Sequence, residues 1–266
     1  MEAKVIGAIV GDIIGSRFEF NNRAAIGPHI VGGDATFTDE TVCIVGLTDA
    51  LLRKSALDQT MREWCRQYSF VSYGKLFSRW VNDSGAGPYN SLGNGCVARV
   101  SVAHLFSDSI LEAARLAEKL SAVTHNHPES LRVVEILSRA LWRVNASGVA
   151  VDIYRELKNG GFTLTLNREE LLSTRVEFSE SVTQIVEPAL SAVMVGENFE
   201  DVMRISIQRG GDTDSICSLA GAFAEPVFGI PNGILLPAIA KLPIEMRVVL
   251  EKALGPKRNI TIQEEV

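Results

Sequence analysis

The chain has 266 residues, 46% of them hydrophobic, and a formal net charge of −6 at pH 7. A chain of this size can bury one large core, so we expect a single domain over residues 1–266. The acidic balance and the lack of a long Lys/Arg run argue against binding to extended nucleic acid.

Cysteine usage and the start of the chain bear on the compartment. The four cysteines lie far apart and form no C-x-x-C pair, which predicts reduced, buried thiols in a cytoplasmic protein. The apolar stretch at the start of the chain is short and contains Glu2 and Asp12. It predicts neither a signal peptide nor a membrane span.

The first predicted helix carries a stripe of glycines. Apolar residues recur with helical spacing from residue 5 to residue 14, and Gly7, Gly11 and Gly15 lie four residues apart. A glycine inside a helix costs about 1 kcal/mol relative to alanine. The stripe therefore indicates the close approach of another helix or of a ligand.

Similar spacing predicts helices through most of the remaining chain. One follows Thr38, and the others span residues 57–70, 75–81, 109–123, 129–144, 149–157, 168–173, 182–194, 199–208, 215–228, 231–242 and 244–253. Ser109, Pro128 and the pair Gly160-Gly161 stand where helices are expected to begin or end. Pro188 predicts a kink or a late helix start.

Strand signals are weak, because only residues 162–166 alternate like a strand and they have no partner. We therefore predict an all-α domain of roughly ten or more helices with short connections. The longest irregular stretches are 20–37 and 82–95, where we expect binding residues.

Two carboxylates lie two residues apart at a predicted helix start, in the stretch RGGDTDS. Inside a helix, Asp212 and Asp214 would point to different sides, but the preceding glycines permit a turn in which both face one ligand. The simpler interpretation is that Asp212 caps the helix and Asp214 lies in its first turn. For this pair alone, the capping interpretation is favoured.

A second acidic cluster, Thr38-Asp39-Glu40-Thr41, also stands at a predicted helix start, where capping is again an alternative. Two oxygen-rich turns together suit hard cations such as Mg²⁺ or Mn²⁺. Four carboxylates brought together without a cation would raise one another's pKa values. We therefore expect the two turns to share one or two divalent cations.

Glu19 and two histidines complete the chemically active candidates. Glu19 follows the glycine stripe, where a carboxylate is available for a cation or for acid–base work, and an ordinary surface glutamate is an equal alternative. The pair His125-x-His127 suits zinc poorly, because no third ligand has suitable spacing. We expect one histidine to contact substrate and the other to lead into a helix.

Five segments, in order along nearly the whole chain, resemble the ADP-ribosylglycohydrolase family, whose founding example reactivates dinitrogenase reductase. GAIVGDIIGSRFE resembles the family's first helix and functional glutamate, FTDET its T-D-D-T metal turn, and RGGDTDSICSLAGA its closing G-G-D-T-D-T metal turn. YNSLGNGCVAR resembles its glycine-rich substrate loop and SAVTHNHPES the T-H segment beside it. Each motif alone is weak, but five in this order are a specific signal.

The resemblance implies an all-α orthogonal multi-helix bundle with a binuclear Mg²⁺ or Mn²⁺ site in a cleft. Glu19 is then the acidic residue close to the reacting centre. The metal ligands carried over by position are Thr38, Asp39, Glu40, Asp212, Asp214 and Ser215. The residues that line the ADP-ribose site are Gly93, Asn94, Gly95 and His125. Two ligands depart from the family pattern, which has aspartate in place of Glu40 and threonine in place of Ser215.

The implied function is metal-dependent hydrolysis of the glycosidic bond between ADP-ribose and an acceptor, which is a protein side chain or another molecule. Tyr89 is a candidate for stacking on adenine. A non-catalytic protein that binds ADP-ribose or another nucleotide is the main alternative, and a purely structural helical protein is a third interpretation. The sequence does not identify the acceptor.

Overall fold

Residues 5–22 and 24–255 are described in a computed structural model of the chain. They form fourteen α-helices and no β-strand, which confirms the all-α prediction. The helices are α1 (Ile6–Gly15), α2 (Asp39–Arg53), α3 (Leu57–Gln67), α4 (Lys75–Asn82), α5 (Val100–Leu105), α6 (Ile110–Ala122), α7 (Pro128–Ser147), α8 (Val151–Asn159), α9 (Arg168–Ser173), α10 (Val186–Val195), α11 (Phe199–Arg209), α12 (Thr213–Phe228), α13 (Asn232–Ile239) and α14 (Ile244–Leu254).

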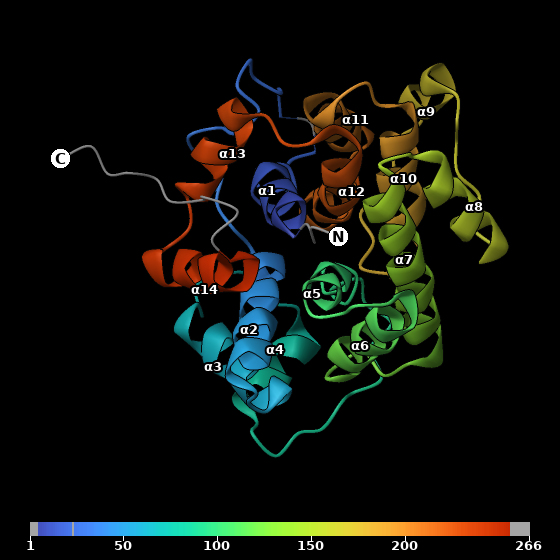
Figure 1. The fold of residues 1–266 in the computed structure, drawn as a ribbon. Helices are drawn as coiled ribbons and strands as arrows, with labels where there is room; N and C mark the ends of the chain where they lie inside the picture. Colours follow the sequence, from blue (N-terminus) through green and yellow to red (C-terminus); the bar gives the residue numbers. More distant parts are fainter. Residues whose placement is uncertain (1–4, 23, 256–266) are drawn as a thin grey trace.

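Helices α1 and α12 pack side by side in the middle of the molecule, and the other helices surround them (Figure 1). The glycine stripe of α1 forms this contact. A Cβ atom on Gly7, Gly11 or Gly15 would lie 2.1, 1.9 or 2.2 Å from a backbone oxygen of α12, so only glycine permits the approach. Of the two explanations for the stripe, close helix packing is the one the structure supports.

Helix boundaries follow the predicted caps closely. The Ser109 hydroxyl accepts a hydrogen bond from the Glu112 amide at the start of α6, and Pro128 is the first residue of α7. Helix α8 ends at Asn159, and Gly160 is its C-cap. Helix α10 begins at Val186, two residues before Pro188, which confirms the late start and not the kink.

The isolated strand-like alternation at residues 162–166 forms no β-strand, which agrees with the all-α prediction. These residues form an extended connection between α8 and α9, with Leu164 buried and Leu166 half exposed. The Thr165 amide donates to the Ser191 hydroxyl on α10 and not to a neighbouring strand. The alternation therefore reflects one buried side chain in a connection, and not a paired strand.

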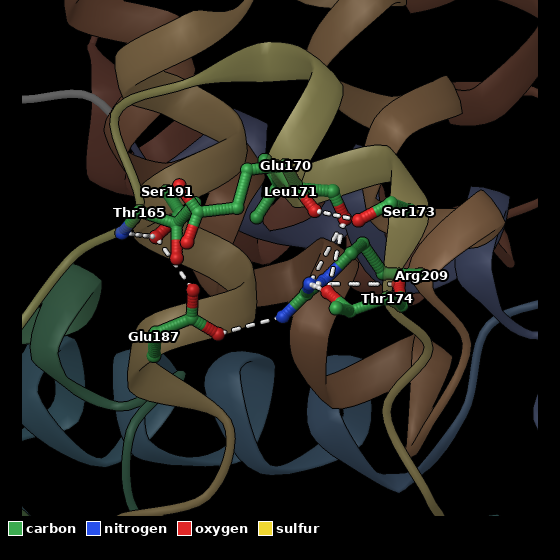
Figure 2. A network of polar contacts seen from close by, with 8 residues as sticks. All are labelled: Thr165, Glu170, Leu171, Ser173, Thr174, Glu187, Ser191 and Arg209. Carbon is green, nitrogen blue, oxygen red and sulfur yellow. Dashed lines mark hydrogen bonds and ion pairs between the residues drawn. The ribbon is translucent and has the colours of Figure 1, made fainter.

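A buried arginine joins α9, α10 and α11 through polar contacts (Figure 2). Arg209, the last residue of α11, donates to Glu187 on α10 at 2.7 Å and to the Leu171 carbonyl on α9 at 3.0 Å. It also donates to the Thr174 hydroxyl, and Glu187 accepts in turn from Ser191. Because Arg209 directly precedes the double glycine, this network fixes the backbone that leads into α12.

None of the described helices is both long and apolar enough to cross a membrane.

Candidate active site

A cavity of about 890 Å³ opens beside the N-terminal ends of α2 and α12. It collects side chains from segments that lie far apart in the sequence. The predicted site residues that line it are Glu19, Asp39, Glu40, Gly93, Asn94, Gly95, His125, Asp212, Asp214 and Ser215. Its volume is within the range of cavities that enclose small-molecule ligands.

Three carboxylates form the tightest cluster on this cavity. Glu19, Asp212 and Asp214 each offer an oxygen, and these oxygens lie within 4.8 Å of one another. Asp212 and Asp214 are buried, whereas Glu19 is half-buried. The cluster consists only of hard oxygen donors, which is the donor type that Mg²⁺ and Mn²⁺ prefer. It therefore fits a divalent cation, and it contains no histidine of the kind a zinc site would use.

The double glycine shapes the turn that carries the two aspartates. Gly210 and Gly211 have φ angles of 79° and 86°, which L side chains rarely adopt. Asp212 stands at the N-cap position of α12 but makes no side-chain cap hydrogen bond. Its Oδ2 accepts instead from the Asn94 side-chain amide at 2.8 Å. The capping interpretation of Asp212 is therefore wrong.

Asn22 holds the Glu19 turn against this segment, a role that the sequence analysis missed. Its side-chain amide donates to the carbonyls of Phe18 and Glu19, and its Oδ1 accepts from the Gly211 amide at 2.6 Å. The Asn22 side chain thus connects the segment that follows α1 to the turn that carries Asp212 and Asp214. Asn22 lies in the irregular stretch expected to hold binding residues, but no motif singles it out.

Burial and mutual repulsion raise the pKa values of two members of this cluster, Glu19 and Asp212. Burial, followed by the charge of Asp214, raises the pKa of Glu19 to about 8. For Asp212, burial and the hydrogen bond with Asp214 raise the pKa to about 10. Without added positive charge these groups hold protons at neutral pH. A bound cation would remove the conflict between them.

The second acidic turn meets the first through a direct hydrogen bond. The Ser215 hydroxyl donates to Glu40 Oε1 at 2.7 Å, and both side chains are buried. Burial and the charge of Asp214 raise the pKa of Glu40 to about 8. Burial and the charge of Glu40 also raise the pKa of Asp39. Asp39 and Glu40 line the cavity, but among the described residues neither belongs to the cluster held within 4.8 Å.

Thr38 is the one predicted ligand that does not line the cavity. Its hydroxyl accepts from the Glu40 amide at 3.4 Å, as the N-cap of α2, and donates to Asp12 at 2.5 Å. The buried Asp12 also accepts from the Thr38 amide and the Thr41 hydroxyl. Asp12, which the sequence analysis read only as an interruption of an apolar stretch, therefore anchors the start of α2 to α1.

The glycine-rich loop contributes shape to the cavity. The Gly93 amide donates to the Ser91 hydroxyl and the Asn94 amide to the Glu180 carbonyl, so two of its backbone amides are used within the protein. A Cβ atom on Gly93 would lie 3.2 Å from His125 Nε2. Glycine here makes room for the His125 ring.

Residues 174–182, which precede α10, form a second segment that the sequence analysis missed, because it has no periodicity. Val176 pairs with Gly210, and the Val182 amide donates to the Leu92 carbonyl. The segment thus connects the double glycine to the glycine-rich loop. It also places Phe178 and the exposed Glu180 on the cavity.

The remaining candidates have ordinary structural roles or stay predictions. His127 caps α7, since its Nδ1 accepts from the Glu129 amide at 3.1 Å, so it is the helix-leading histidine. The cysteines are free and buried. Tyr89 lines the cavity with its ring centroid 6.2 Å from that of His125, and its contact with adenine stays a prediction.

Comparison with known proteins gives a consistent result. A family model described as ADP-ribosylglycohydrolase matches residues 2–232. The chain is 25% identical to an ADP-ribosylarginine hydrolase Tri1 of Serratia proteamaculans, over 92% of this chain and 75% of the relative. It is also 25% identical to the ADP-ribosyl-[dinitrogen reductase] glycohydrolase of Rhodospirillum rubrum, over 91% of both chains. A solved structure titled ADP-ribosylglycohydrolase-related protein complex has the same fold, with a TM-score of 0.71, 22% identity and coverage of 95% of this chain and 96% of that one.

Proposed function

The chain belongs to the ADP-ribosylglycohydrolase family, and on this premise we propose that it hydrolyses the bond between ADP-ribose and an acceptor. The observation that carries the proposal is the cluster of Glu19, Asp212 and Asp214 on the cavity that also holds the glycine-rich loop and His125. The carboxylates would contact the ribose whose bond is cleaved, and the glycine-rich loop with His125 would contact the rest of the ADP-ribose. Cleavage at C1 of the ribose passes through an oxocarbenium-like centre, which nearby carboxylates stabilise.

We infer that the acidic turns hold one or two Mg²⁺ or Mn²⁺ ions. Asp39, Glu40, Asp212, Asp214 and Ser215 supply the oxygens, and Thr38 supports the turn or adds a further oxygen. When bound, such an ion orients ribose hydroxyls and lowers the pKa of water. Glu19 is the half-buried member of the cluster and faces the cavity. It takes a proton from the attacking water or gives one to the leaving group.

The segment beside the glycine-rich loop, residues 174–182, supports an arginine-linked acceptor, as in the Tri1 relatives. Glu180 is exposed on the cavity, and its charge contributes to the raised pKa of Glu19. Phe178, half exposed, comes from the same segment and lines the same cavity. A carboxylate beside an open aromatic ring suits a planar guanidinium, which pairs with the first and stacks on the second.

The test is a panel of defined ADP-ribosylated substrates assayed with Mg²⁺, with Mn²⁺ and with a chelator. We expect release of ADP-ribose from arginine-linked substrate, faster than from serine-linked substrate, and loss of activity with the chelator. Glu180→Gln should lower kcat/KM for the arginine-linked substrate about tenfold, the cost of one charge-assisted hydrogen bond. Glu177→Gln, on the same segment but away from the cavity, is the matched control.

A non-catalytic ADP-ribose-binding protein is the second candidate. Glu40 favours it, because this longer side chain bonds to Ser215 and lies outside the tight carboxylate cluster. Binding of ADP-ribose with no turnover of any substrate in the panel would support this alternative and contradict the hydrolase.

A further inference from the structure

A buried arginine, Arg99, lines the cavity together with the glycine-rich loop. Arg99 is 1% exposed and lines the cavity. Its Nη1 donates to the carbonyls of Leu120 and Ser121, at the C-terminal end of α6, and to the Thr124 hydroxyl at 2.8 Å. The negative end of the α6 dipole favours a positive charge at this place. Arg99 is therefore fixed by α6 and the turn that follows it.

The Thr124 hydroxyl connects Arg99 to His125. Thr124 is fully buried, and its Oγ1 lies 2.7 Å from His125 Nδ1. A guanidinium can only donate, so Arg99 uses a lone pair of this oxygen. The single hydroxyl proton is then free to be donated, and His125 Nδ1 is the acceptor in reach. In a neutral imidazole whose Nδ1 accepts, the proton is on Nε2.

The other ring nitrogen of His125, Nε2, lies on the side of the ring near the glycine-rich loop and the cavity. Nε2 lies against the loop that holds Gly93 and Gly95, and all three residues line the cavity. Burial and the positive charge of Arg99 lower the pKa of His125, so the ring is neutral at physiological pH. The amides of Gly93 and Asn94 donate within the protein, and the Nε2–H group adds a donor beside this loop.

We propose that Arg99 and Thr124 are positioning residues that hold His125 as the neutral Nε2–H tautomer, so that His125 donates a hydrogen bond to an oxygen of the bound ligand. The ligand assignment rests on the proposed function, since ADP-ribose presents diphosphate and hydroxyl oxygens as acceptors. In this arrangement His125 does not act as a general base, because its only unprotonated nitrogen accepts from Thr124.

The tautomer is measured directly from the ring-nitrogen chemical shifts of protein labelled with ¹⁵N-histidine, at pH 7. The His125 signals are assigned by their loss in His125→Gln. We expect wild-type His125 to carry its proton on Nε2. Thr124→Val removes the hydroxyl at nearly unchanged shape and should give a mixture of tautomers, whereas Thr124→Ser should restore the wild-type spectrum. Melting temperatures confirm that each variant is folded.

Binding of ADP-ribose, followed by calorimetry, tests the ligand side. We expect Thr124→Val to raise the Kd about tenfold and Thr124→Ser to leave it near the wild-type value. Wild-type His125 with its proton on Nδ1 would overturn the proposal without any variant or substrate. A tautomer change that leaves the Kd unchanged would overturn the hydrogen bond to the ligand. The expected tautomer in a protein that neither binds nor cleaves ADP-ribose would overturn the proposed function and leave the positioning of His125 intact.

Discussion

Glu19 is the member of the carboxylate cluster that the cavity reaches most easily. It is half-buried, whereas Asp212 and Asp214 are buried, and Asn22 fixes the backbone turn on which it stands. Glu19 therefore differs from the two aspartates in its exposure to the cavity, although all three side chains are carboxylates. Under the proposed function, this difference makes Glu19 the group that exchanges protons with a substrate and the two aspartates the groups that hold a cation.

Replacing Glu19 with glutamine tests this assignment. Glu19→Gln keeps the size and removes the titrating proton, so we expect kcat to fall by a factor on the order of 10²–10⁴. The melting temperature should equal or exceed that of the wild type, because the change removes repulsion from a cluster of like charges. Glu169→Gln, an exposed position on α9, is the control for both measurements. Unchanged turnover on a confirmed substrate would remove Glu19 from the mechanism.

The raised pKa values predict how stability depends on pH in cation-free protein. The folded-state pKa of Glu19 lies at about 8, above its unfolded value of 4.5, and that of Asp212 is also raised. At a pH between the unfolded and the folded pKa value, the folded state binds more protons than the unfolded state. The free energy of unfolding is therefore highest below the unfolded pKa and falls as pH rises towards the folded pKa. Chelator-treated protein should melt at lower temperature at about pH 8 than at about pH 5.

Excess Mg²⁺ should reduce this loss of melting temperature at high pH, because added positive charge stabilises the deprotonated carboxylates. Asp212→Asn should reduce it as well, since it removes a titrating group. A melting temperature of chelated wild-type protein that rises from pH 5 to pH 8 would contradict the raised pKa values.

At the scale of elements, the contact between α1 and α12 brings Glu19 close to Asp212 and Asp214. The α1 glycines bring the helices so close that Glu19, just beyond the end of α1, faces Asp212 and Asp214 at the start of α12. Gly11→Ala would place a Cβ atom 1.9 Å from the Cys217 carbonyl oxygen. We expect it to lower the unfolding free energy by roughly 3 kcal/mol, as severe overpacking does, in urea denaturation.

Gly33→Ala is the matched control for this prediction, because a Cβ atom there meets nothing within 4 Å. Its unfolding free energy should stay within about 0.5 kcal/mol of the wild type. If Gly11→Ala were as stable as Gly33→Ala, the tight packing of α1 on α12 would not be required for the fold.

The sequence predicts the helices well because their apolar residues recur at helical spacing, and it fails where no periodicity exists. The sequence analysis misses helix α5 because five of its six residues are buried, so its sequence lacks a one-sided apolar pattern. The N-cap of α5, Arg99, lines the cavity. The segment 174–182 and Asn22 were missed because their contacts are with residues distant in sequence. The motifs single out the carboxylates that the fold brings to the cavity, whereas the residues that position them depend on tertiary contacts that no local signal reveals.

At the scale of the whole molecule, the cavity exists only because the fold unites segments from opposite ends of the chain. Ser215 bonds to Glu40 across 175 positions of sequence, and Asn94 bonds to Asp212 across 118. A cation held between the two turns would therefore bind the folded state and not the unfolded chain. Such binding raises the unfolding free energy by about 2.7 kcal/mol at a cation concentration 100 times its Kd.

The Asp212→Asn variant distinguishes between two interpretations of the acidic turns, a shared cation site and simple helix caps. Asparagine caps a helix about as well as aspartate, and Asp212 makes no cap hydrogen bond, so basal stability should change little. The rise in melting temperature that Mg²⁺ or Mn²⁺ produces in the wild type should be lost, and activity should be lost with it. Asp58→Asn, at an exposed position in the first turn of α3, should keep the full cation-dependent shift. An undiminished shift in Asp212→Asn would mean that the cation binds elsewhere, because a site built on this cluster cannot lose one of its three carboxylates without losing affinity.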